Sequence, residues 1–170
     1  MAVTSIADLV CKLKITEGNT LIGAGNTAAT YEHMINLSTR YLSGITANKG
    51  DRVWSDRQSA AAGVNSIDLA GTLTSVLSGA VVTFVTVKGI LIRNLSSTST
   101  ENLAIGGGAN PLINWVADAT DIVNLGPSGV FLLVSPIDGY DVTADTGDLL
   151  QIDPGADTIS YDIIVWGTSA

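Results

Sequence analysis

Short apolar segments with turn-forming residues between them recur at intervals of about ten residues, and this feature most restricts the fold of the chain. After residue 94 the separating sequences are Ser96–Thr100, Gly106–Gly108, Gly126–Gly129, Asp138–Gly139, Thr146–Gly147 and Asp153–Gly155. Such spacing leaves room for strands but not for helices of ordinary length. It therefore predicts an all-β chain folded as an antiparallel sandwich or barrel, of which we expect the sandwich.

Alternation of apolar and polar residues locates individual strands. The last predicted strand, Thr158–Trp166, has one apolar face made of Ile159, Tyr161, Ile163 and Val165. The segment Val81–Asn94 is apolar on both faces, which predicts one long strand that is buried on both sides. Further strands are predicted at Tyr31–Leu37, Asp51–Arg57 and Ser66–Leu69.

The first predicted strand, Cys11–Thr16, alternates between apolar residues and the lysines Lys12 and Lys14. This pattern predicts a half-buried strand in which Cys11 is a small core residue. Short helical turns are expected at Ser5–Val10, Leu73–Leu77 and Pro111–Val116. We expect one domain overall, with residues 1–50 forming N-terminal strands that could act as an arm or subunit contact, and residues 51–170 forming the sandwich.

Charge is low and unevenly distributed along the 170 residues. Charged residues make up 14% of the chain, against about 25% in typical soluble domains, and the net charge is −8. All eight basic residues precede residue 94, so the first part carries +2 and the rest −10. Nucleic-acid binding by the acidic part is excluded because phosphates require clustered Lys and Arg. Apolar runs are too short for a membrane span, and no export signal is recognised.

No set of residues predicts an enzyme. The chain has one histidine, His33, and one cysteine, Cys11, which are too few for a zinc site and far apart in sequence for a nucleophilic pair. There is no Gly-x-Ser-x-Gly sequence to present a catalytic serine. The triple glycine Gly106–Gly108 lacks the lysine of a phosphate-binding loop. We therefore expect neither catalysis nor a cofactor.

Two binding sites remain as weaker alternatives. Asp138, Asp141 and Asp145 are the best candidates for calcium ligands, although aspartate is also common in turns for local hydrogen bonding. The tryptophans Trp54, Trp115 and Trp166 could form a platform for sugars, as in carbohydrate-binding modules, but core packing is the favoured interpretation because each lies among aliphatic residues.

Several segments from Asp51 to the C-terminus resemble small virion structural proteins of tailed bacteriophages. The segments that carry this resemblance are Asp51–Arg57, Ile67–Gly71, Phe84–Asn94, Gly126–Leu133, Val142–Leu150 and Tyr161–Ala170. Together they extend over about two thirds of the chain. They are framework strands and turns, so they indicate a virion component more firmly than they identify which one.

Within that group the chain is most similar to a capsid decoration, or cement, protein. The resemblance implies a jelly-roll-like sandwich that binds the outer capsid surface through the major capsid protein and through dimers or trimers of itself. It also implies synthesis in the bacterial cytoplasm. A tail or neck component is the alternative within virion proteins, and a carbohydrate-binding adsorption module is the alternative of another class.

The charge distribution suggests how such a protein would face its partner. The residues expected to contact a partner are Lys12, Lys14, Arg52, Trp54 and Arg57. The basic members of this set would lie against an acidic capsid surface, and the part that carries −10 would face outward or line a symmetry axis. Membranes and nucleic acids are not expected partners.

Overall fold

The chain divides into two compact units. The computed structural model describes residues 7–19, 29–71, 73–76 and 78–170. One unit spans Asp8–Tyr41 and is here called the ribbon, and the other contains Leu42–Ala170 and is here called the body. Each unit is considered by itself below.

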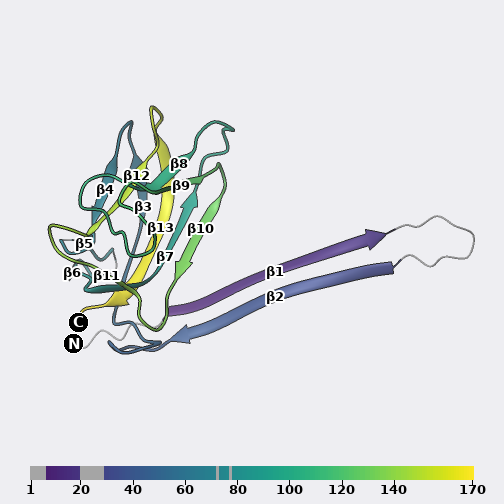
Figure 1. Ribbon diagram of the computed structural model, residues 1–170, viewed down its shortest axis with the longest axis horizontal. Helices are drawn as coiled ribbons and strands as arrows, with labels where there is room; N and C mark the ends of the chain where they lie inside the picture. The colour runs from purple at the N-terminus through teal and green to yellow at the C-terminus, as the bar shows by residue number, and fades with distance from the viewer. Residues whose placement is uncertain (1–6, 20–28, 72, 77) are drawn as a thin grey trace, which may run out of the picture. The chain divides into compact units, whose positions relative to one another are not determined.

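The ribbon is a two-stranded sheet of β1 (Ala7–Asn19) and β2 (Ala29–Tyr41), which run in opposite directions (Figure 1). The strands predicted at Cys11–Thr16 and Tyr31–Leu37 are therefore confirmed. The prediction that Cys11 is a core residue is wrong, because its side chain is exposed and that of Leu13 is 53% exposed. Alternation identified the apolar face, but the described residues include no second layer that buries it.

The described residues of the body form two large antiparallel sheets and one small two-stranded sheet (Figure 1). The five-stranded sheet has the order β10–β7–β13–β3, with β11 also paired to β7. Its strands are β3 (Arg52–Ala60), β7 (Thr86–Asn94), β10 (Val130–Val134), β11 (Tyr140–Asp141) and β13 (Ile159–Thr168). The four-stranded sheet has the order β4–β12–β8–β9. Its strands are β4 (Asn65–Asp68), β8 (Leu103–Gly106), β9 (Ile122–Leu125) and β12 (Leu149–Asp153).

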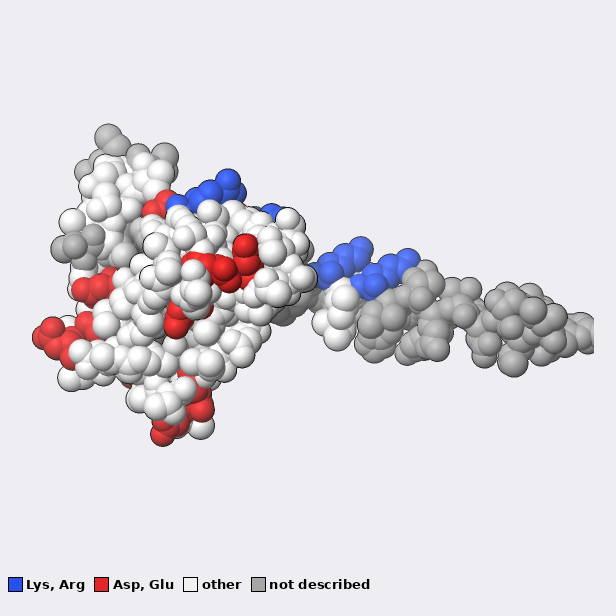
Figure 2. Space-filling view, turned by 90° about the horizontal axis from the view of Figure 1, so that it is seen from above, with Lys and Arg blue, Asp and Glu red and all other residues white. Residues whose placement is uncertain are grey.

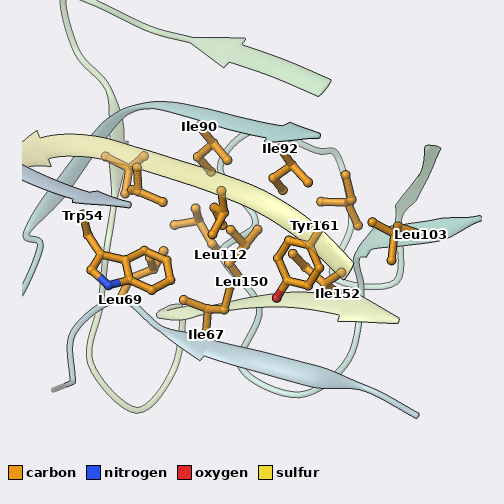
Figure 3. Close-up of a cluster of buried hydrophobic side chains, with 14 of the residues drawn as sticks. Trp54, Ile67, Leu69, Ile90, Ile92, Leu103, Leu112, Leu150, Ile152 and Tyr161 are labelled. Atoms are coloured by element: carbon orange, nitrogen blue, oxygen red, sulfur yellow. The ribbon is translucent and has the colours of Figure 1, made fainter. Parts of the chain in front are cut away.

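A continuous hydrophobic core lies between these sheets (Figure 3). The five-stranded sheet contributes the predicted face of β13, whose four apolar residues are each at most 1% exposed. It also contributes Trp54, Ile90 and Ile92, which face Leu150 and Ile152 of the four-stranded sheet. Each fully buried aliphatic side chain stabilises the fold by about 1.5–3 kcal/mol relative to exposure. The all-β prediction is confirmed, and the arrangement is consistent with a β-sandwich.

The segment Val81–Asn94 forms two strands rather than the one predicted. Val81–Val82 (β6) pairs with Leu73–Thr74 (β5), while β7 begins only at Thr86. Between these two strands the Phe84 N–H donates to the carbonyl of Leu69, and the Val85 N–H donates to the carbonyl of Thr168. These two hydrogen bonds take residues 84 and 85 out of the β5–β6 ladder. β7 lies between β10 and β13 within its sheet, but it is not buried on both sides as predicted, because Leu91 is half-buried and Arg93 is exposed on the side away from the core.

The predicted helical turns are absent from the described residues. Ala7–Val10 belongs to β1, Leu73–Thr74 is β5, and the stretch 111–116 forms turns. Each predicted segment is so short that few hydrogen bonds could offset the cost of helix nucleation. Within the described residues no helix is long and apolar enough to cross a membrane.

Candidate contact surface

The face of the five-stranded sheet that points away from the core, here called the outer face, contains three rows of aligned residues across β10, β7, β13 and β3. The strand register gives the rows as Val130–Arg93–Asp162–Arg57, Leu132–Leu91–Ile164–Ser55 and Val134–Gly89–Trp166–Val53. Because side chains alternate between the faces of a strand, these residues lie opposite the core positions. The outer face is therefore built from strands that come from distant parts of the chain.

The outer face is mostly apolar although it is not fully buried. Val130 is 59% exposed and Ile164 is 39% exposed, while Leu91, Leu132 and Val134 are half-buried. These residues are neighbours in adjacent rows, so they form one continuous patch. Continuous apolar patches on a soluble domain are characteristic of contact surfaces.

One row of the outer face is charged and its net charge is positive. The Arg57 guanidinium donates from Nε and Nη2 to the two carboxylate oxygens of Asp162, at 2.7 and 3.1 Å. This hydrogen-bonded pair lowers the pKa of Asp162 below its ordinary value, and the positive charge of Arg93 acts in the same direction. Two arginines therefore flank one aspartate within an apolar surface.

Exposed acidic side chains of the body lie elsewhere. They occupy loops and strand ends, at Asp68, Asp118, Asp138, Asp141, Asp145 and Asp157. Figure 2 shows acidic side chains scattered over the body in that view. From Leu42 to Ala170 there are 13 acidic and 5 basic residues, a net charge of −8. The net charge of the outer face is thus positive, whereas the net charge of the body as a whole is negative.

The residues predicted to contact a partner do not form one surface. Lys12 and Lys14 are exposed on β1 of the ribbon. Arg52, at the start of β3, donates from Nη1 to the Asp51 carboxylate at 3.2 Å. Only Arg57 lies on the outer face. Trp54 is a correction, because its side chain is 4% exposed in the core and offers almost no surface to a partner.

Sequence reasoning missed Arg93 and the apolar residues around it as contact candidates. The alternation of Thr158–Trp166 did place Asp162 and Ile164 on the side away from the core. What it could not supply was the pairing of strands, since Arg57 and Asp162 are 105 residues apart. The charged row and the apolar residues beside it can be recognised as one surface only once β3, β13 and β7 are aligned.

Glycine at position 89 allows an unusually close contact on the outer face. Gly89 aligns with Trp166, and a Cβ placed on Gly89 would lie about 2.0 Å from Cζ2 of the indole ring. The ring therefore rests directly on the backbone of β7. This contact buries Trp166 to 5% exposure even though it belongs to the outer face.

The calcium candidates Asp138, Asp141 and Asp145 do not form a metal-binding group with other described residues. The Asp138 carbonyl accepts a hydrogen bond from Nζ of the buried Lys88 at 2.9 Å. Asp145 has a positive φ of 67°, and its N–H donates to the Asp148 carboxylate at 2.8 Å. Asp141 pairs in β11. Among the described residues no group of three or more His, Cys, Asp or Glu side chains is placed to hold a metal ion.

The three tryptophans do not form an exposed platform. Trp54 and Trp166 are buried. Trp115 is half-buried, its Nε1–H donates to the Leu112 carbonyl at 2.7 Å, and its ring meets the edge of Phe131 with the centroids 5.5 Å apart. The side chain of His33, the other candidate for chemistry, lies outside the described residues.

Comparison with known proteins adds no relative. No protein-family model, curated protein sequence or solved structure matches the chain. A functional interpretation therefore depends on the strand order of the body and on the outer face.

Proposed function

We propose that the chain is a non-enzymatic structural protein of a tailed-bacteriophage virion, and within that class a decoration protein on the outside of the capsid. In this role the body binds the major capsid protein and stabilises the head, and copies of the chain also contact one another as dimers or trimers. No cofactor, nucleic acid or membrane takes part. The observation that carries the proposal is the apolar, positively charged outer face on an otherwise acidic sandwich.

The strand order supports a jelly-roll version of the sandwich. The sheets have the orders β3–β13–β7–β10 and β4–β12–β8–β9, so the first two strands of the body, β3 and β4, pair with the last two, β13 and β12, and the strands between them complete each sheet. Apart from the two-residue strand β11, the two sheets contain eight strands with this nested pairing, which suits a jelly roll, an architecture that occurs in viral capsid and lectin domains. Fold-level analogy of this kind supports a virion role without establishing it.

The outer face suits a partner that is both apolar and acidic. Leu91, Leu132 and Ile164 would be removed from water, while Arg57 and Arg93 would face carboxylates of the capsid. The exposed aspartates on the loops of the body would then remain in solvent. Many copies of the protein on one capsid lattice would multiply the stabilising effect of each single contact.

The test is binding of the purified protein to capsids that lack it. Charge reversal of both arginines, Arg57→Glu with Arg93→Glu, should weaken binding at least about tenfold at low salt. Lys49→Glu is the matched control, because Lys49 is an exposed basic residue of the body outside the outer face, and it should bind like the unchanged protein. Thermal melting must show that the double variant is folded, since it also removes the Arg57–Asp162 ion pair.

Three results would contradict the proposal. One is undiminished capsid binding by the folded double variant. Another is the presence of the protein as a few copies at a single vertex of intact particles, which would favour a tail or neck component. The third is glycan binding that Trp115→Ala abolishes, which would favour an adsorption module.

A further inference from the structure

The ribbon has an apolar face whose central residues are exposed among the described residues. Asp8 and Arg40 form an ion pair at 2.7 Å, and a shallow hollow lined by Asp8, Val10, Ser38 and Arg40 confirms that these residues share one face. Strand alternation places the other even-numbered residues of β1 and β2 on this same face, Lys12, Lys14 and Met34 among them, and the odd-numbered residues on the opposite face. Its described members are Leu9, Cys11 and Leu13 of β1 and Ile35 and Tyr41 of β2.

This apolar face is exposed to a degree that the core strands of the body never show. Leu13 is 53% exposed and Ile35 is 57% exposed, and Cys11 is exposed as well, whereas Leu9 is half-buried and Tyr41, the last residue of β2, is buried. A two-stranded hairpin by itself is marginally stable in water, and its apolar face is stabilised when another layer covers it. The ribbon therefore has the composition of half a sandwich.

We propose that the apolar faces of two ribbons, from two copies of this chain, pack against each other to form a small two-layer β-sandwich. The described side chains of this face carry no charge, so this described part of the face can meet its own copy across a twofold axis without like-charge repulsion. The outer face of the body differs in this respect, because its two arginines outweigh one aspartate and would repel an identical surface. Charge thus assigns the ribbon to self-contact and the outer face to a different partner.

The area available sets the strength of the contact. Two strands of 13 residues each, about 3.4 Å per residue and about 4.8 Å apart, present a face of about 420 Å². Two such faces bury about 850 Å² in flat projection, below the about 1,200 Å² at which stable interfaces begin. The isolated protein should therefore dimerise weakly, with a dissociation constant of about 10 µM to 1 mM. Copies held side by side on a lattice would pair because their effective concentration is far higher.

This self-contact deepens the proposed function and rests on it for its biological setting, but the two can fail separately. Dimerisation is measured on the isolated full-length chain, whereas capsid binding is measured with the outer-face variants. A protein that binds capsids and never dimerises would overturn the ribbon proposal alone. A protein that dimerises and ignores capsids would overturn the decoration proposal alone.

Sedimentation equilibrium over a concentration series is the first measurement. The double variant Leu13→Lys with Ile35→Lys should raise the dimer dissociation constant at least about tenfold, because it places charges on both faces of the contact. Val10→Lys is the matched control, since Val10 is exposed on the opposite face of the same strand, and it should change the constant less than about twofold. A monomer at every concentration up to about 1 mM, or equal effects of both sets of variants, would overturn the proposal.

Cysteine crosslinking provides a second measurement that does not depend on affinity. Cys11 is the single cysteine of the chain, so Cys11→Ser gives a background into which one cysteine can be placed at Leu9, Leu13 or Ile35, or at Val10 or Met34 as controls on the opposite face. Under mild oxidation at least one position on the apolar face should form disulfide-linked dimers about tenfold faster than both controls. Comparable rates on the two faces would overturn the proposal.

Discussion

Strands β1 and β13 have the same kind of sequence and reach opposite outcomes. Both alternate apolar and polar residues, and both were predicted to be strands with one buried face. In β13 that face is at most 1% exposed, whereas in β1 Leu13 is 53% exposed. The difference teaches that alternation determines where side chains point, while burial requires a second layer that alternation does not encode.

The two units also differ in how far apart in sequence their partners are. The body joins β3 to β13 across about a hundred residues, as the Arg57–Asp162 pair shows with its separation of 105. The ribbon joins strands that are neighbours in the chain. Local pairing without a buried core permits local opening, so the ribbon should separate and re-form without unfolding the body.

The largest expected effect is on the free energy of unfolding, when an isoleucine is replaced by alanine in the body and, for comparison, in the ribbon. Ile163→Ala removes a side chain that is 1% exposed in the core, and we expect the free energy of unfolding to fall by about 2–5 kcal/mol. Ile35→Ala, at 57% exposure in the ribbon, should change it by less than about 0.5 kcal/mol when the protein is dilute enough to be monomeric. Urea unfolding followed by tryptophan fluorescence reports the body, since all three tryptophans lie there.

Equal losses for these two isoleucine variants would show that the ribbon and the body unfold as one cooperative unit. In that case the ribbon and the body would differ in how their side chains are packed, but not in when they unfold.

A smaller effect is expected at alkaline pH, and only in the body. Burial raises the pKa of Tyr161 to about 12, which the hydrogen bond donated by Asn65 to its hydroxyl partly opposes. The neutral phenol is thus favoured by the fold, so this contribution is complete below the unfolded pKa of about 10 and is lost as pH rises toward 12. Unfolding free energies measured across that range should decline less steeply in Tyr161→Phe. An unchanged decline would mean that other groups govern alkaline unfolding.

The smallest effect is expected in acid, where each unit offers one ion pair. Hydrogen bonds from Arg57 and Arg40 lower the pKa of Asp162 and of Asp8. Each pair therefore stabilises its unit above the ordinary aspartate pKa of about 3.8, and the contribution is lost as pH falls through the lowered value. We expect Asp162→Asn to flatten the acid limb of body unfolding slightly and Asp8→Asn to leave it unchanged. The difference should shrink in high salt, because both pairs are partly exposed.

Much of the body could be predicted from local pattern. Alternation identified the buried face of β13 and the strand that contains Trp54, because a strand of a two-layer fold repeats its environment every second residue. It failed where the environment depends on distant residues. The long apolar segment Val81–Asn94 was predicted as one strand, but the backbone near Phe84 bonds to Leu69 and to Thr168 and leaves the ladder.

The candidate contact surface could be predicted only in part. Arg57 was predicted as a contact because it belongs to the basic first part of the chain. Trp54, three residues earlier in the same strand, was wrongly predicted as a contact, since an odd spacing puts the two side chains on opposite faces and Trp54 points into the core. Arg93 carried no local sign of its role. Arg93 can be recognised as part of the charged row only because Asp162 aligns with it in the neighbouring strand. Which strands are neighbours depends on the topology of the sheet, and adjacent sequence does not reveal it.

The contact between Gly89 and Trp166 has a consequence for how this sequence can change. Because the indole ring occupies the space that any side chain at position 89 would need, a larger residue there is compatible with the fold only if position 166 becomes smaller. A single exchange at position 89 would lose stability, and a paired exchange would recover it. Relatives of this chain should therefore vary at these two positions together, as a linked pair.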